Sequence, residues 1–147
     1  MASLDQYADK YPSIRMERRN GILQMTFHTD GGPLQWGGSP HKEFSQVFVD
    51  VGSDTENRIV IMTGTGDAFT GPQGTAAGTP KRAPKDWDQT YWEGKRLLLN
   101  LLDIEVPTLT SGDSLSADFR VEEVEGRCRY YHQLSGNRYY IEYDAAN

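Results

Sequence analysis

The apolar run from Ile59 to Met62 constrains the fold of this chain more than any other feature. Its successive side chains, Ile-Val-Ile-Met, leave no polar face, and most of them are β-branched. A strand of this composition is buried on both faces, which is typical of a parallel sheet. Parallel neighbours need a crossover connection, usually a helix. The segment Asn57–Thr63 therefore predicts an α/β fold with helical crossovers.

A β-hairpin is predicted near the start of the chain. Ile14–Arg19 alternates apolar and charged residues, as a half-buried strand does. Asn20-Gly21 follows, and both residues tolerate the positive φ of a two-residue hairpin turn. Ile22–Phe27 is the expected return strand. The sheet is therefore expected to be mixed, with an antiparallel hairpin beside parallel strands.

A helix is predicted over Pro40–Val51, between the hairpin and the buried strand. Ser39 is the expected N-cap and Pro40 the first helical residue. The apolar residues recur at the spacing of a single helix face. They are Phe44, Val47, Phe48 and Val51. Gly52 marks the expected end of the helix.

A second helix is predicted over Asp86–Asp103, and its apolar residues are spread widely around it. The expected apolar stripe consists of Trp87, Tyr91, Trp92, Leu98, Leu99 and Leu102. With the run Leu97–Leu99, the helix is apolar on too many faces for a simple surface helix. We therefore expect it to supply a contact surface between copies of the chain. After it, Val106–Leu109 is expected to begin another strand.

The chain changes character at position 110. Three segments with strand-like patterns follow a linker-like stretch and are expected to form an antiparallel meander. They are Phe119–Val124, Arg127–Leu134 and Arg138–Tyr143. We therefore divide the chain into a mixed α/β part, residues 1–109, and an all-β tail, residues 110–147.

The charge balance argues against several classes of partner. The chain of 147 residues has a net charge of -6 and a pI of about 5.0. Nucleic acids and anionic membranes attract basic surfaces, so neither is expected as a partner. No run approaches the roughly 18 apolar residues of a membrane span.

The cysteine and histidine content bears on compartment and cofactors. Cys128 is the only cysteine, so no intrachain disulfide can form. The polar N-terminal segment has no secretory signal, and we expect a cytoplasmic protein. The three histidines and Cys128 have no metal-ligand spacing, so neither a metal nor another cofactor is predicted.

The segment Gly31–Phe44, with the sequence GGPLQWGGSPHKEF, is the most informative for function. The strand Arg58–Met62 follows it, and then the loop Thr63–Thr75. This order resembles the front half of a crotonase-superfamily domain, of the enoyl-CoA hydratase/isomerase type. Within that superfamily, the chain is most similar to the branch of 6-oxocamphor hydrolase and β-diketone hydrolases. The resemblance ends near Leu109, so it implies a partial crotonase-like ββαβα unit followed by an unrelated tail.

This resemblance implies half of an oxyanion site in the loop after the strand. Crotonase-like enzymes hold developing negative charge with two backbone N–H groups. Matching the family's Phe to Phe69 puts Gln73 in the donor position, and Pro72 has no N–H to donate. Gln73 is therefore a predicted catalytic residue, with a plain Gly-Pro turn as the alternative. The second donor of the family would follow Val106–Leu109, where this chain departs from the pattern.

His41 is the other predicted catalytic residue. In the branch that the chain resembles, a His at the matching helix start contributes to the active site. An imidazole can act there as a general base or hydrogen-bond a carbonyl. Trp36, Leu34 and Phe69 are predicted to bind substrate. The alternatives are that His41 is simply a polar residue in the first helical turn and that Trp36 is an ordinary core aromatic.

Three functions are consistent with these residues. The first is a hydrolase that cleaves a carbon–carbon bond in a β-diketone by retro-Claisen chemistry, with a small-molecule ketone as substrate. The second is a non-catalytic binding or assembly protein, which the missing second donor and the unmatched tail favour. The third is an acyl-CoA hydratase or isomerase, for which Lys81-Arg82 is a weak phosphate site. A half-fold leaves a sheet edge open, so we expect the tail to cover that edge or the chain to self-associate as a trimer or hexamer.

Overall fold

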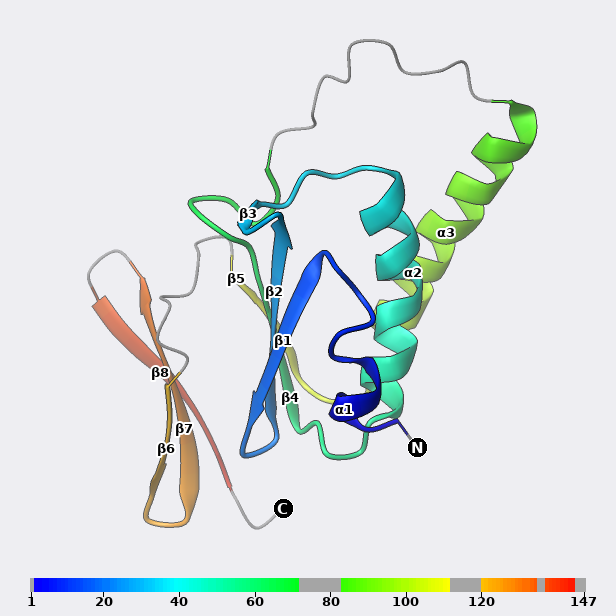
Figure 1. Ribbon diagram of the computed structural model, residues 1–147. Coiled ribbons are helices and arrows are strands. Elements are labelled where there is room, and N and C mark those ends of the chain that lie inside the picture. The colour runs from blue at the N-terminus through cyan, green and yellow to red at the C-terminus, as the bar shows by residue number, and fades with distance from the viewer. Residues whose placement is uncertain (1, 72–82, 112–119, 135–136, 145–147) are drawn as a thin grey trace.

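The computed structural model describes residues 2–71, 83–111, 120–134 and 137–144. Its elements are a mixture of helices and strands, so the α/β class is confirmed (Figure 1). In chain order they are α1 (Leu4–Tyr7), β1 (Ile14–Arg19), β2 (Ile22–Thr29), β3 (Gly32–Pro33), α2 (Gly38–Ser53), β4 (Ile59–Thr63), α3 (Pro84–Leu102), β5 (Thr108–Ser111), β6 (Arg120–Val124), β7 (Arg127–Leu134) and β8 (Asn137–Asp144).

The main sheet has the strand order β1-β2-β4-β5, with β3 paired to β2. The β1–β2 hairpin is antiparallel as predicted, and its turn residues Asn20 and Gly21 have φ values of 50° and 80°. Strand β4 runs parallel to both β2 and β5. All residues of β4 are buried, so the prediction of a parallel strand covered on both faces is confirmed.

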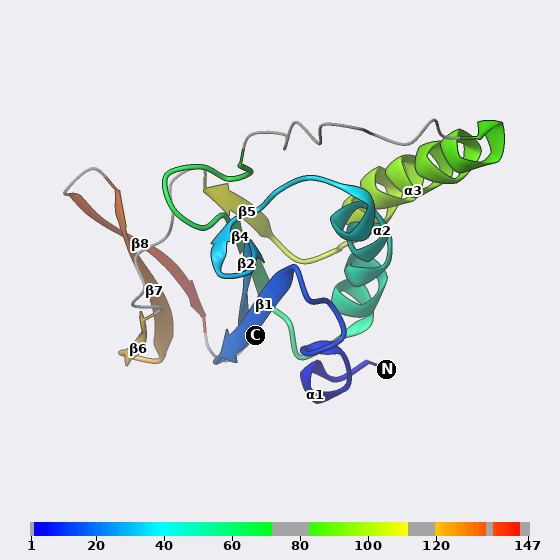
Figure 2. The ribbon, with the colours of Figure 1, turned by 45° about the horizontal axis from the view of Figure 1, so that its top comes forward.

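Helices α2 and α3 lie together on one side of this sheet (Figure 2). The core forms where α2 meets the sheet, and the predicted apolar face of α2 is buried as expected. Burial of such side chains is the main driving force for folding. The cluster includes Leu23, Met25 and Phe27 from β2, Val60 and Met62 from β4, and Phe44, Val47, Phe48 and Val51 from α2.

The predicted start of α2 was wrong by two residues. The helix begins at Gly38 with Gly37 as its N-cap, rather than at Pro40 after Ser39. The Ser39 hydroxyl instead donates to Oε1 of the buried Glu43, at 2.7 Å. Pro40 fits inside the first turn because the first N–H groups of a helix have no intrahelical acceptor. The helix also runs past Gly52 to Ser53.

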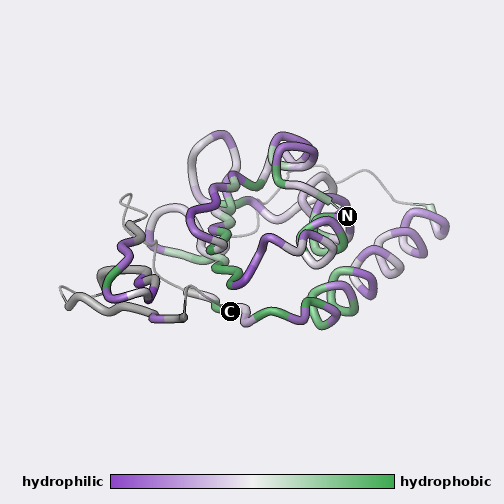
Figure 3. Tube along the Cα trace, turned by 90° about the horizontal axis from the view of Figure 1, so that it is seen from below, coloured by the Kyte–Doolittle hydropathy of each residue, from purple (hydrophilic) through white to green (hydrophobic). Residues whose placement is uncertain are grey.

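Helix α3 leaves most of its predicted apolar stripe in solvent. Tyr91 and Leu102 are each 80% exposed, whereas Glu93 is buried and Leu97 half-buried against the core. Figure 3 shows the apolar end of the helix in green. Although α3 is the longest helix described, no helix in the described ranges is long and apolar enough to cross a membrane. The helix begins at Pro84, slightly before the predicted Asp86, because proline suits a first helical position.

A buried polar network fastens the N-terminal segment to the end of α2. The Tyr7 hydroxyl donates to Oδ2 of Asp54 at 2.8 Å and accepts from Nδ2 of Asn57 at 3.2 Å. Arg18 of β1 forms an ion pair with the same Asp54 carboxylate, at 2.6 Å. Burial, followed by the bond to Asp54, raises the pKa of Tyr7 well above its ordinary range.

The tail forms the predicted antiparallel meander as a sheet of its own, β6-β7-β8. Hydrogen bonds from Arg127 and then Arg129 hold the pKa of the Glu142 carboxyl below its usual value. The meander lies on the side of the main sheet away from α2 and α3 (Figures 1 and 2). Among the described residues it does not extend the main sheet, where β5 pairs only with β4.

Candidate active site

The bend before α2 brings Trp36 and His41 together. The chain leaves β3, passes Leu34 and enters the helix after Gly37. The ring of Trp36 meets the ring of His41 edge to face, with centroids 5.7 Å apart. Its other neighbour is Phe44, at 5.3 Å. Trp36 therefore packs at the edge of the core and contacts the ring of His41.

Glu93 of α3 completes a hydrogen-bonded pair with His41. Its Oε2 lies 3.1 Å from Nδ1 of His41, and its Oε1 accepts from Nε2 of Gln89 at 2.7 Å. Glu93 is only 7% exposed, so its carboxylate depends on these partners. A carboxylate that binds Nδ1 fixes the orientation of the imidazole ring.

The other nitrogen of His41 faces the backbone of α3. A Cβ atom built on Gly94 would lie 3.5 Å from both Cε1 and Nε2 of the ring. No described residue hydrogen-bonds to this Nε2. With Nδ1 held by Glu93, Nε2 is the nitrogen that can take a proton.

The loop after β4 packs against the bend before α2. The N–H of Gly71 donates to the carbonyl oxygen of Leu34 at 2.6 Å, and the Thr65 hydroxyl donates to the carbonyl of Phe27 at 2.8 Å. Phe69 lies half-buried with its ring 5.3 Å from that of Phe27. The segments 31–36 and 64–71 thus meet at one end of the sheet, as an active site built from both requires.

The predicted site residues differ in how they are placed. Leu34 is completely buried in the core, and its carbonyl rather than its side chain holds the loop. Phe69 packs at the edge of that core. Gln73 lies outside the described residues, so its role as an oxyanion donor stays a prediction.

Glu93 is the residue that the sequence reasoning missed. The predicted contact surface of α3 consisted of its apolar residues, which lie on the side of the helix away from Glu93. The available signal was the Gln89–Glu93 pair, four residues apart on a helix that was expected to pack against the rest of the fold. A carboxylate on such a face needs a partner, and His41 is the partner it has.

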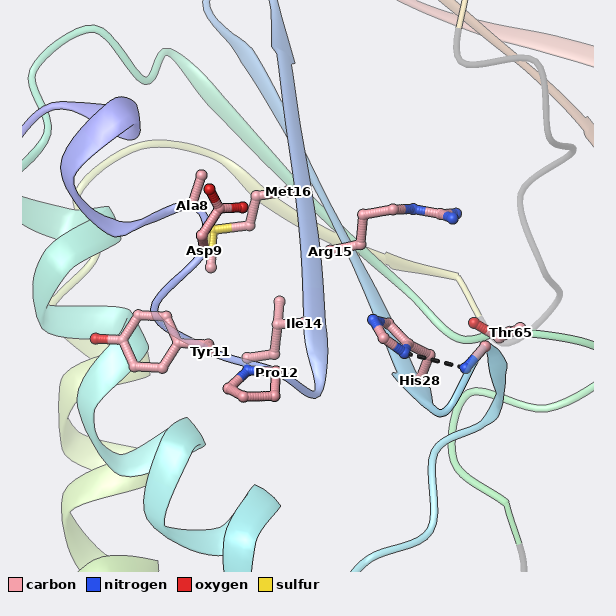
Figure 4. A pocket seen from close by; sticks show the side chains of 10 residues that line it. Ala8, Asp9, Tyr11, Pro12, Ile14, Arg15, Met16, His28 and Thr65 are labelled. Atoms are coloured by element: carbon pink, nitrogen blue, oxygen red, sulfur yellow. Dashed lines mark hydrogen bonds between the residues drawn. The ribbon is translucent and has the colours of Figure 1, made fainter.

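A separate cavity of about 350 Å³ lies between the N-terminal segment and strands β1 and β2 (Figure 4). Its lining includes Tyr11, Arg15 and His28, and none of the predicted site residues. His28 accepts a hydrogen bond from the N–H of Gly31 at 3.4 Å. This cavity is therefore distinct from the surroundings of His41.

Several solved structures are similar to this chain. No protein-family model and no curated protein matches the chain. Among solved structures, it is similar to ABDH, a β-diketone hydrolase from the cyanobacterium Anabaena sp. PCC 7120 bound to (S)-3-oxocyclohexyl acetic acid. The two are 42% identical, with a TM-score of 0.68, over 74% of this chain and 44% of that one.

Two more distant structures show the same fold. An enoyl-CoA hydratase from Shewanella pealeana is 16% identical, with a TM-score of 0.61, over 77% of this chain and 43% of that one. An enoyl-CoA hydratase/isomerase from Mycobacterium paratuberculosis is also 16% identical, with a TM-score of 0.60, over 69% and 41%. This chain therefore spans less than half the length of each of these relatives, and it carries a partial crotonase-like fold.

Proposed function

We propose that this chain supplies the general-base side of a hydrolase site that cleaves a carbon–carbon bond in a cyclic β-diketone. The observation that carries the proposal is the contact of 3.1 Å between Nδ1 of His41 and Oε2 of Glu93. The 42% identity to a protein described as a β-diketone hydrolase supports the choice of substrate class. Trp36 beside the imidazole offers an apolar wall for a ring-shaped substrate.

His41 would act through Nε2. Glu93 accepts a hydrogen bond from Nδ1–H, which leaves Nε2 unprotonated and able to accept a proton from water. The imidazolium that forms is then stabilised by the buried carboxylate next to it. A pair of this kind contributes about 10²- to 10⁴-fold to a rate when it works as a general base.

The reaction balances without a cofactor. Water adds to one carbonyl carbon and gives its proton to His41. The bond between that carbon and the carbon lying between the two carbonyls then breaks, and its electron pair forms an enolate on the second carbonyl. The imidazolium returns the proton to carbon, which leaves a ketone and a carboxylic acid in one product. The ligand described for ABDH, (S)-3-oxocyclohexyl acetic acid, carries these two groups.

The enolate needs hydrogen-bond donors, and the loop after β4 is where we place one of them. The N–H of Gln73 is the proposed donor, two residues beyond Gly71, which the Leu34 carbonyl holds. The chain spans 44% of ABDH, so we assign it only this part of a site. The alternative is a non-catalytic chain that binds the ketone but does not turn it over, because the sequence after Val106–Leu109 departs from the pattern that would carry the second donor.

Turnover of a bicyclic diketone tests the proposal. The substrate is the bicyclic β-diketone that gives (S)-3-oxocyclohexyl acetic acid on addition of water, and chromatography follows its conversion to that acid. We expect conversion by the wild-type chain and a loss of about 10²-fold or more in His41→Ala. His28→Ala is the matched control, because His28 lies in the separate cavity and should retain the wild-type rate.

Three results would contradict the proposal. Binding of the acid without turnover would identify a non-catalytic ketone-binding protein. Hydration of an unsaturated acyl-CoA by the same preparation would identify the hydratase alternative. Diketone turnover unaffected by His41→Ala would remove the proposed base.

A further inference from the structure

The cavity of about 350 Å³ at the start of β1 is built from parts of the chain that are far apart in sequence. Its walls come from residues 8–12, from the β1–β2 hairpin, and from Gly31 and Thr65 in two separate loops. The volume lies at the lower end of the range for small-molecule sites, about 300–1,000 Å³. The cavity therefore has room for one small ligand, away from the candidate active site.

Two hydrogen-bond donors of the cavity lie on the same face of the hairpin. Arg15 of β1 is paired with Thr26 of β2, so His28 is its diagonal neighbour two residues further along β2. Diagonal neighbours lie about 7–8 Å apart, within reach of long side chains. Figure 4 shows Arg15 and His28 on one side of β1, with Thr65 next to His28. The two side chains are thus placed to bind the two oxygens of one carboxylate.

The hydrogen bond at the ring of His28 makes its Nε2 a donor. Its Nδ1 accepts the N–H of Gly31 at 3.4 Å, in a turn where Asp30 and Gly31 have φ values of 51° and 81°. A neutral imidazole that accepts at Nδ1 carries its hydrogen on Nε2. Within the described ranges no residue accepts that hydrogen. An acceptor in the cavity would satisfy it.

The guanidinium of Arg15 likewise has no ion-pair partner in the part of the chain that the structure describes. Glu17, its neighbour on the same face of β1, pairs with Arg19. Asp9 also lines the cavity, but Figure 4 shows it on the other side of β1, beside Met16. One end of the cavity is therefore positively charged and the other end negatively charged.

This arrangement of charge selects a ligand with a single negative group. A carboxylate at the Arg15 end is attracted, whereas a second carboxylate near Asp9 is repelled. Between the two ends, Pro12, Ile14 and Met16 supply an apolar wall. An aliphatic chain is the ligand group that gains from contact with such a wall.

We propose that this cavity binds a small aliphatic monocarboxylate. Its carboxylate accepts hydrogen bonds from the guanidinium of Arg15 and from Nε2 of His28, and its hydrocarbon part lies against Pro12 and Met16. Bonds from a guanidinium to a carboxylate are among the strong hydrogen bonds of proteins. The site takes no part in the turnover proposed for His41, so either proposal can fail without the other.

Titration with hexanoate, followed by NMR of the histidine rings, tests this proposal. The chain has three histidines, so the ring signals are few, and variants that lack one histidine assign them. Hexanoate should shift the signals of His28 and leave those of His41 unchanged, at about 50 mM salt to limit screening. Hexanamide has a similar shape but no charge, and it should bind about tenfold more weakly or less.

Arg15→Gln should weaken the binding of hexanoate about tenfold, because it removes the charge that holds the carboxylate. Arg19→Gln is the matched control. It makes the same change on the same face of β1 but lies outside the cavity, so it should bind hexanoate like the wild type. Circular dichroism checks that both variants are folded.

Each other outcome would overturn the proposal. If hexanoate shifted the signals of His41 rather than His28, the carboxylate would belong to the candidate active site. If acetate or inorganic phosphate bound as tightly as hexanoate, the cavity would be a general anion site in which the apolar wall has no part. Equal binding by Arg15→Gln and Arg19→Gln, or no binding of hexanoate to the wild type, would remove the site altogether.

Discussion

Nδ1 of His41 lies 3.1 Å from Oε2 of Glu93, and this contact joins helix α2 to helix α3 across one edge of the core. Glu93 is buried and also accepts a hydrogen bond from Gln89, so its carboxylate is held in place on the side of α3 that faces α2. The orientation of the imidazole is thus fixed by the packing of α3 against α2, the helix that carries His41.

Glu93→Leu should change which nitrogen of His41 carries the proton. With Glu93 as acceptor, we expect the Nδ1–H form of the neutral ring, since a carboxylate accepts but does not donate. Leucine removes the acceptor, so the ring should shift toward the Nε2–H form. NMR of the imidazole nitrogens measures this directly. Glu93→Gln keeps an acceptor oxygen and should resemble the wild type; an unchanged tautomer in Glu93→Leu would argue against the pair.

Phe44→Ala should cost about 3–5 kcal/mol in the free energy of unfolding. Phe44 is 4% exposed, and its ring contacts Phe27 at 4.6 Å as well as Trp36. The cavity left behind would therefore lie between the sheet and the candidate site. Urea unfolding measures the change. Val49→Ala on the outer face of the same helix should cost less than about 1 kcal/mol, because Val49 is half exposed.

Gly64→Ala should destabilise the loop that follows β4 by about 2 kcal/mol or more. A Cβ atom at this position would lie 2.1 Å from the carbonyl oxygen of Ala68 and 2.6 Å from Cα of Phe69. The backbone itself would have to shift, and Phe69 would move with it. Thermal unfolding tests this, with Gly38→Ala as control, because no atom lies within 4 Å of the added Cβ there. Equal melting temperatures for the two variants would contradict the predicted clash.

In Tyr7→Phe, the free energy of unfolding should fall less steeply than in the wild type as the pH rises above 10. Burial raises the pKa of Tyr7 in the folded state above the ordinary value of 10.0. The unfolded chain therefore loses this proton first, so the contribution of Tyr7 is complete below pH 10 and falls as the pH rises further. Urea unfolding at a series of pH values should show a shallower decline for Tyr7→Phe than for the wild type.

The same variant should also be less stable at neutral pH. It loses the hydrogen bond to Asp54 and the one from Asn57, which together contribute about 1–3 kcal/mol. Tyr91→Phe is the control for stability at neutral pH, because that side chain is largely in solvent. An identical decline with pH in Tyr7→Phe and the wild type would show that Tyr7 does not carry the effect.

Local patterns in the sequence were enough to predict β1, β2 and β4, but not the short β3 strand. The Asn20-Gly21 turn fixes the first hairpin, and the uninterrupted apolar run of β4 requires cover on both faces. The start of α2 could not be predicted in this way. Ser39 has the chemistry of a cap, but its hydroxyl binds Glu43, whose carboxylate also accepts the backbone N–H of Ser13 at 2.8 Å. The hydrogen bond from Ser39 to Glu43 therefore depends on a contact between distant parts of the chain.

The candidate site was predictable only in part, for the same reason. The bend and His41 belong to one continuous segment whose resemblance to a family could be seen directly. Glu93 becomes a site residue only because α3 packs against α2 on the less apolar of its two sides. Hydrophobic periodicity locates an apolar face on a helix, but it does not say whether the core or another protein covers that face.

The strand order of the main sheet also has a consequence for how the chain folds. The β1–β2 hairpin joins neighbouring residues, whereas β4 pairs with β2 and with β5 only after two helical crossovers have closed. Such long-range pairings make folding slow. Until they form, β4 is an unpartnered apolar strand of the kind that associates between chains. During synthesis or refolding, we therefore expect Ile59–Thr63 to be a segment that chaperones bind.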